Sequence, residues 1–201
     1  MKSIRAKTFV AVGTSTGGPR ALEKMLTDLP PNFQASLLIV QHMPAGFTKS
    51  LAERLNRLTR LHVKEAVHGE VIHPSTAYIA PGNFHMKIQR AGAGYVIELT
   101  KEKERNGHRP AVDVLFESLA VLDNVNKIAV ILTGMGHDGS QGIIQLKTKD
   151  VNTIVIAEAE ASAIVYGMPK AALGTNFVDH IRHLHKIGET INGLVNSSRG
   201  M

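Results

Sequence analysis

The 201-residue sequence contains no cysteine and no tryptophan, and only 4% of its residues are aromatic. The lack of cysteine excludes disulfide bonds, thiol catalysis and zinc sites with cysteine ligands. The shortage of aromatic residues argues against a stacking surface for single-stranded nucleic acid. No apolar run is long enough to span a bilayer, and the basic N-terminus is not followed by the apolar stretch of a secretory signal. We therefore expect a cytoplasmic protein without membrane insertion.

The charge of the chain is moderately basic, with a formal net charge of +6. A basic surface can meet nucleic acid or an acidic protein. The lysines and arginines are scattered, however, and residues 101–105 alternate lysine or arginine with glutamate. A solvated surface of mixed charge explains this segment better, so we expect no nucleic-acid partner.

Short apolar runs alternate with helical patterns along most of the chain. The runs at 8–12, 37–40, 128–132 and 153–157 predict buried strands, because a parallel strand covered on both faces is apolar throughout. Residues 77–80, 85–88 and 95–99 have turns between them and predict an antiparallel meander or hairpin attached to this core. The fold class predicted is α/β: a doubly wound, mostly parallel sheet in three αβα layers with a small antiparallel hairpin insertion. We expect residues 1–201 to form one domain with its core at about 8–195.

The turn after the first strand, residues 13–18, is rich in glycine and hydroxyl side chains, and three interpretations of it are open. Its serine and threonines could cap the following helix, since these residues are favoured N-caps. Pro19 suits the first helical position, however, which puts the cap near Gly18 and leaves Ser15 about a turn too early. Its backbone N–H groups could hold a phosphate, although the glycines match neither common phosphate-binding fingerprint. Finally, the turn matches G-x-S-x-G, in which an exposed serine, here Ser15, is a nucleophile.

Polar residues follow three of the predicted strands: Ser15, His42 and Asp138. Because the carboxyl ends of parallel strands meet at one edge of the sheet, we expect these side chains to converge. A serine needs a base to take its proton, and the base needs a carboxylate that fixes its tautomer. Backbone donors for an oxyanion would come from Thr16 and from the turn at 134–136. Taken singly, His42 could be a structural histidine and Asp138 a turn or cap residue.

Six segments together resemble the catalytic domain of chemotaxis protein-glutamate methylesterases. The resemblance extends over about residues 8–194, and its segments are Gly13–Gly18, Gln41–Thr48, Tyr78–Gly82, His108–Asp113, Ile131–Gly139 and Tyr166–Pro169. The family has a doubly wound α/β fold and a Ser-His-Asp triad, which matches Ser15, His42 and Asp138 here. In the family, the methionine that matches Met135 contributes its backbone N–H to the oxyanion site.

The resemblance implies a serine hydrolase that removes γ-methyl esters from glutamates on the cytoplasmic domains of methyl-accepting chemotaxis receptors. Deamidation of receptor glutamines is a second activity of the family. Both reactions pass an acyl group to water through an acyl-enzyme, and neither needs a cofactor or a metal. We also expect His108 and Arg109, in a basic turn before a helix, to form part of the substrate cleft.

The sequence departs from the family pattern in two respects. Family members usually carry an N-terminal receiver domain, whereas this chain starts almost at the catalytic strand, so we expect no receiver domain in it and one only in a longer natural chain. His137 stands where the family often has asparagine beside the triad aspartate. Two alternative functions are a phosphate- or nucleotide-binding protein that uses the loop at 13–18, and a receptor-binding module without catalysis.

Overall fold

The structure is a computed structural model that describes residues 7–197; the basic residues 1–6 and the C-terminal residues 198–201 lie outside the described part. Its centre is a seven-stranded parallel sheet with the strand order β3-β4-β2-β1-β7-β8-β9. The strands are β1 (Lys7–Thr14), β2 (Ser36–Gln41), β3 (His62–Glu65), β4 (Thr76–Ile79), β7 (Val125–Ile131), β8 (Ile154–Glu158) and β9 (His180–Arg182). The predicted doubly wound α/β class is confirmed.

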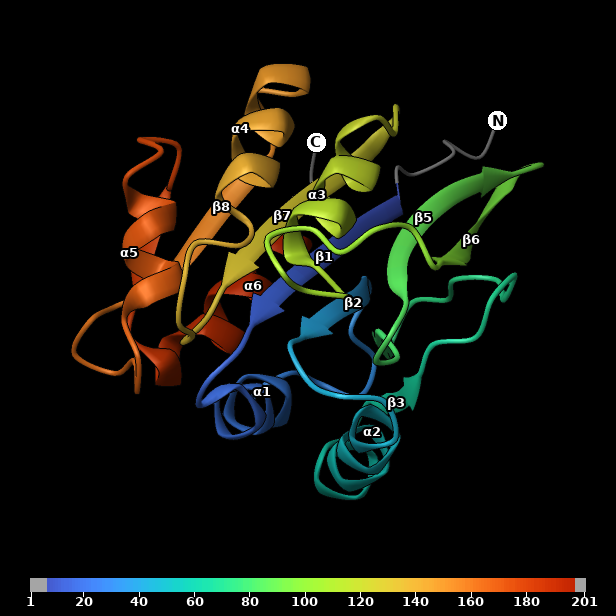
Figure 1. Cartoon of the computed structure of the whole chain (residues 1–201), viewed down its shortest axis with the longest axis horizontal. Helices are drawn as coiled ribbons and strands as arrows, with labels where there is room; N and C mark the ends of the chain where they lie inside the picture. Colours follow the sequence, from blue (N-terminus) through green and yellow to red (C-terminus); the bar gives the residue numbers. More distant parts are fainter. Residues whose placement is uncertain (1–6, 198–201) are drawn as a thin grey trace.

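Helices cover both faces of the sheet, which gives the three predicted layers (Figure 1). One face carries α1 (Gly18–Thr27), α2 (Phe47–Leu58) and α6 (Leu184–Ser197). The other carries α3 (Val112–Ala120), α4 (Ser140–Lys149), α5 (Gly167–Leu173) and an antiparallel hairpin of β5 (His85–Ala91) and β6 (Gly94–Thr100). Figure 1 shows the hairpin on the opposite side of the molecule from α5.

Strand β1 shows why a continuously apolar sequence predicts a strand buried on both faces. Phe9 and Ala11 pack into the apolar cluster formed with α3 and the hairpin, whereas Val10 and Val12 pack into the cluster formed with α1 and α6. All four are at most 1% exposed. A strand buried on both faces has no solvent side, so its sequence is continuously apolar instead of alternating.

The expected antiparallel meander is wrong in one part. Residues 77–80 do not pair with the hairpin; β4 lies in the main sheet, parallel to β2 and β3. Among the strands of residues 7–197, β5 and β6 are the one antiparallel pair. Burial on both faces explains the difference, because every residue of β4 is buried, as expected of a strand inside the main sheet. Strands β3 and β9 were not predicted, because both are short and mostly polar.

The order of the strands reverses beside β1, and this reversal positions the site. On one side of β1 lie β2, then β4, then the edge strand β3. The chain afterwards crosses to the other side of β1, where it enters the sheet as β7. The helices that follow β1 and β7 pack on opposite faces of the sheet. A crevice forms at such a point, at the carboxyl ends of the strands, and is where ligands bind in this fold class.

Candidate active site

Ser15 follows β1 directly and lies in the turn that leads into α1. The N-cap of α1 is Gly17, with φ of 84°, and no side chain caps this helix. The Ser15 N–H donates to the Thr133 carbonyl at 3.0 Å, and the Ser15 carbonyl accepts from the Gly18 N–H at 2.9 Å. The first interpretation of the turn, capping by its hydroxyl groups, is therefore wrong, because a left-handed glycine occupies the cap position.

Gln41, the last residue of β2, joins the serine turn to His42. Its side-chain amide donates to the carbonyls of Ser15 at 3.0 Å and of His42 at 3.1 Å. The His42 N–H donates in turn to the Thr14 carbonyl at 3.1 Å. These bonds hold the ends of β1 and β2 in register, so Ser15 and His42 emerge side by side. Sequence reasoning missed Gln41, which reads as an ordinary polar residue at a strand end.

The His42 ring contacts the carboxylate of Asp138, with 2.7 Å between Nε2 and Oδ2. Both side chains are nearly inaccessible, at 7% and 2% exposure. The same carboxylate accepts the N–H groups of Val112 at 2.7 Å and Asp113 at 3.0 Å. Burial alone would raise the pKa of Asp138, but the bonds from His42, Asp113 and Val112 outweigh it and hold the pKa below its usual value.

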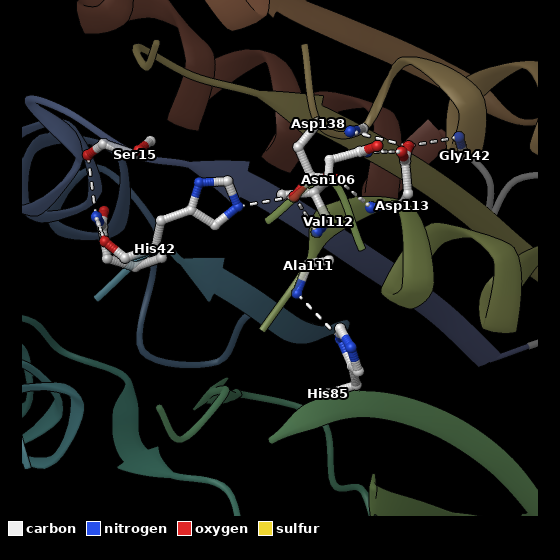
Figure 2. A network of polar contacts seen from close by, with 11 residues as sticks. Ser15, His42, His85, Asn106, Ala111, Val112, Asp113, Asp138 and Gly142 are labelled. Atoms are coloured by element: carbon white, nitrogen blue, oxygen red, sulfur yellow. Dashed lines mark hydrogen bonds and ion pairs between the residues drawn. The ribbon is translucent and has the colours of Figure 1, made fainter. Parts of the chain in front are cut away.

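The charge of Asp138 decides the tautomer of His42. An ionised carboxylate only accepts hydrogen bonds, so Nε2 of His42 carries the proton and Nδ1 keeps its lone pair. Nδ1 is buried and has no hydrogen-bond partner among residues 7–197. Figure 2 shows Ser15 on the Nδ1 side of the ring, away from Asp138. The structure thus pairs His42 with Asp138 and leaves the second ring nitrogen on the side where Ser15 lies (Figure 2). The catalytic roles of the three residues stay a prediction.

Two backbone donors lie beside Ser15. Gly134 packs so closely on this turn that a Cβ there would come 2.8 Å from the Ser15 Cβ and 2.4 Å from the Met168 sulfur, so only glycine fits. In the described chain, the N–H groups of Thr16 and Met135 donate no hydrogen bond. Met135 is 68% exposed. The predicted oxyanion role of the Thr16 and Met135 N–H groups stays a prediction.

His108 and Arg109 lie before α3 and line one cleft together with His42. The His108 ring stacks on the His42 ring, with 3.7 Å between centroids and 8° between planes. The Arg109 guanidinium donates to the Glu102 carbonyl at 3.1 Å. Both residues line an open cleft of about 380 Å³, together with His42, Met43, Pro44, Asn83, Glu104, Gly107 and Pro110. The predicted place of both residues in the substrate cleft stays a prediction.

Asp113, in the first turn of α3, is a residue that sequence reasoning missed. Its Oδ1 accepts the N–H groups of Gly139 at 2.9 Å and Gly142 at 2.8 Å, at the start of α4, and its Oδ2 accepts the Asn106 amide at 2.9 Å. Asp138, just before α4, accepts N–H groups at the start of α3. The two aspartates therefore cap each other's helices (Figure 2). An acidic first-turn residue is common in helices, so the local pattern does not indicate this contact.

A buried glutamate stabilises the turn after β7. Glu158, fully buried at the end of β8, accepts the Thr133 N–H at 2.8 Å and the Ser162 hydroxyl at 2.9 Å. The Thr133 hydroxyl donates to the Thr16 carbonyl at 3.0 Å. Burial raises the pKa of Glu158. This chain of contacts connects β8 to the serine turn, and sequence reasoning missed it because no apolar or glycine pattern marks it.

Comparison with known proteins gives consistent matches. The family model described as CheB methylesterase matches residues 10–191. A crystal structure of the Thermotoga maritima CheB methylesterase catalytic domain superposes with a TM-score of 0.89 at 41% identity, covering 94% of this chain and 99% of that one. A protein-glutamate methylesterase/protein-glutamine glutaminase of Halalkalibacterium halodurans is 54% identical over 92% of this chain. A relative of the same name from Pyrococcus abyssi is 42% identical over 98%.

The chain spans about half the length of the curated relatives it matches, 53% in both of these cases. Within the described residues, no helix is long and apolar enough to cross a membrane. The same part of the chain holds no group of three or more side chains arranged to bind a metal ion.

The exchanged caps give a stability prediction. Replacing Asp113 by alanine leaves the Gly139 and Gly142 N–H groups without their acceptor, and we expect the free energy of unfolding to fall by about 1–3 kcal/mol. Asp113→Asn is the matched control, because its amide oxygen still accepts both. Denaturant unfolding of the three proteins at pH 7 measures the difference. Equal stability of Asp113→Ala and wild type would contradict the role of the cap.

The stability difference between wild type and Asp113→Asn should also depend on pH. Burial raises the pKa of Asp113, and the charge of Asp138 raises it further, although the Gly142 and Gly139 N–H groups oppose the shift. A raised carboxyl pKa contributes stability at low pH that is lost as pH rises through the folded value. Wild type should therefore lose stability relative to Asp113→Asn as pH rises from about 4 to 7.

Proposed function

Because the chain belongs to the CheB methylesterase family, we propose that it hydrolyses γ-methyl esters of glutamate, and deamidates glutamine, on the cytoplasmic domains of methyl-accepting chemotaxis receptors. The observation that carries the proposal is the state of the His42 ring. Its Nε2 lies 2.7 Å from the Asp138 carboxylate, while its buried Nδ1 has no hydrogen-bond partner among residues 7–197. This is the arrangement that a serine nucleophile requires of its base.

The reaction begins with Ser15. Its hydroxyl oxygen attacks the carbonyl carbon of the ester, while His42 Nδ1 takes the hydroxyl proton. The imidazolium that forms is stabilised by the ionised Asp138 on Nε2. The negative charge that develops on the carbonyl oxygen is stabilised by the free N–H groups of Thr16 and Met135, which belong to the serine turn and to the turn after β7.

The second half of the reaction returns the enzyme to its starting state. The bond from carbon to the methoxy oxygen breaks, His42 gives its proton to the leaving group, and methanol departs from an acyl-enzyme on Ser15. Water then attacks the acyl carbon, with His42 again as base, and the Ser15 oxygen leaves with the proton. The products are glutamate and methanol. With glutamine as substrate, ammonia leaves in place of methanol, so one site can perform both reactions.

The proposal includes the extent of the catalytic unit. We assign residues 1–201 to one methylesterase catalytic domain with its core at about 8–195, and we place it in the cytoplasm, where the receptor domains lie. A receiver domain in a longer natural chain stays a prediction. His137, which replaces the family's frequent asparagine, is exposed and leaves the contacts of Asp138 in place.

Methanol release from methylated receptor tests the function. We expect wild type to release methanol and Ser15→Ala to lose about 10³–10⁶ in kcat, because the nucleophile is removed. Ser50→Ala, an exposed serine of α2, is the matched control and should keep full activity. Equal release by wild type and Ser15→Ala would contradict the proposal, as would a wild type that binds receptor without turnover.

Asp138→Asn separates catalysis from ligand binding. Oδ2 of Asp138 accepts from His42 and Val112, and Oδ1 accepts from Asp113. An amide has only one accepting oxygen and cannot replace both, so we expect kcat to fall by about 10³–10⁴ while receptor affinity changes little. The lowered pKa of Asp138 means that its stabilising charge is present above the usual value of 3.8 and is lost only as pH falls through the lowered value. The difference in unfolding free energy between wild type and Asp138→Asn should therefore stay constant from pH 7 to about 5. A kcat unchanged in Asp138→Asn would contradict the role of Asp138, whereas phosphate binding that survives the substitution, without turnover in either protein, would favour the phosphate-binding alternative.

A further inference from the structure

His108 contacts the face of the His42 ring and not its edge. At 3.7 Å between centroids and 8° between planes, the two rings overlap as parallel plates. The hydrogen-bonding nitrogens of His42 lie in the plane of its ring, so the stack leaves Nε2 free for Asp138 and Nδ1 free toward Ser15. A contact of this kind restricts tilting of the ring without competing for either nitrogen.

The segment that carries His108 is firmly held. The N–H of His108 donates to the Arg105 carbonyl at 2.9 Å, and the Arg105 N–H donates back at 3.0 Å. Between them, Asn106 and Gly107 both have positive φ, as in a tight hairpin turn. The Asn106 side chain donates to Asp113, the residue that caps α4 beside Asp138. The turn and the carboxylate side of the site are therefore one connected unit.

The charged groups that face His108 come from three parts of the chain. They are His42 after β2, Asp138 and His137 before α4, and Glu104 in the segment between β6 and the turn. Burial lowers the pKa of His108, the charge of His42 lowers it further and His137 adds to this, whereas Asp138 and Glu104 act in the opposite direction. His108 is accordingly neutral at neutral pH.

We propose that His108 is a positioning residue, which holds the plane of the His42 ring so that Nδ1 stays directed at Ser15. This inference rests on the proposed serine mechanism. His42 becomes positively charged when it takes the serine proton, and the face of a neutral aromatic ring favours a neighbouring cation. A protonated His108 would instead repel that charge. Protonation of His108 on acidification should therefore lower the activity.

Substitutions at His108 distinguish the effect of its flat ring from the effect of its protonation. His108→Phe keeps an aromatic face that cannot titrate, whereas His108→Leu and His108→Gln are of similar size and lack the flat face. We expect His108→Leu and His108→Gln to lower kcat about three- to tenfold with KM nearly unchanged, since an aromatic pair contributes on that scale. We expect His108→Phe to keep kcat within about twofold of wild type and to lose activity less steeply between pH 7 and 5.5.

The test has two readouts, of which the second does not depend on the natural substrate. The first is methanol release from methylated receptor, measured as kcat and KM against pH. The second is the rate at which a fluorophosphonate labels Ser15: the serine oxygen displaces fluoride from phosphorus, and its proton passes to His42. Labelling that is slowed by Leu and Gln and restored by Phe supports the positioning role. If the variants show this labelling pattern but wild type releases no methanol, the proposed substrate is wrong and the positioning role stands.

Other patterns would overturn the inference. Unchanged labelling and unchanged kcat in His108→Leu and His108→Gln, with unfolding temperatures equal to wild type, would show that the stack does not position His42. A rise in KM alone, equal in all three variants, would make His108 a substrate contact instead.

Discussion

The site depends on one buried carboxylate. Asp138 accepts hydrogen bonds from the His42 ring and from two amides at the start of α3, and these bonds keep it ionised despite its burial. Its charge places the His42 proton on Nε2 and leaves Nδ1 as the group that can take a proton. The same bonds fix α3 against the turn before α4, while Asp113 fixes α4 in return. The same Asp138 carboxylate therefore caps α3 and sets the position of the proton on His42.

The fold supplies the positions that this arrangement needs. Strands β2, β1 and β7 lie side by side in the sheet, so the residues that follow them emerge at one edge. Backbone bonds from Ser15 to Thr133 and from His42 to Thr14 connect the three strand ends directly. Gln41 and Glu158 add side-chain bonds to the same turns. Ser15 and His42 thus project from the ends of rigid elements, which limits the ways in which they can move apart.

The sequence predicts those parts of the structure that depend on burial and on strand order. Continuous apolar runs indicate strands covered on both faces, and parallel strands bring Ser15, His42 and Asp138 to one edge. It did not predict β3 and β9, whose residues HVKE and HIR carry no apolar run, and it put β4 in the wrong sheet. The roles of Asp113, Gln41 and Glu158 could not be predicted, because each acts through a contact with a residue distant in the sequence. His108 was expected in the substrate cleft, but its stacking on His42 was not. Local pattern gives such residues ordinary roles as helix-start, strand-end or turn residues.

The tautomer of His42 tests the account most directly. Nitrogen NMR of the full chain with ¹⁵N-labelled histidine, at a pH where the ring is neutral, reports which ring nitrogen carries the proton. The account predicts a proton on Nε2, with its signal displaced by the strong hydrogen bond to Asp138, and a loss of that displacement in Asp138→Asn. A neutral ring with its proton on Nδ1 would contradict the account, because a donor would then face Ser15 and nothing could accept the serine proton.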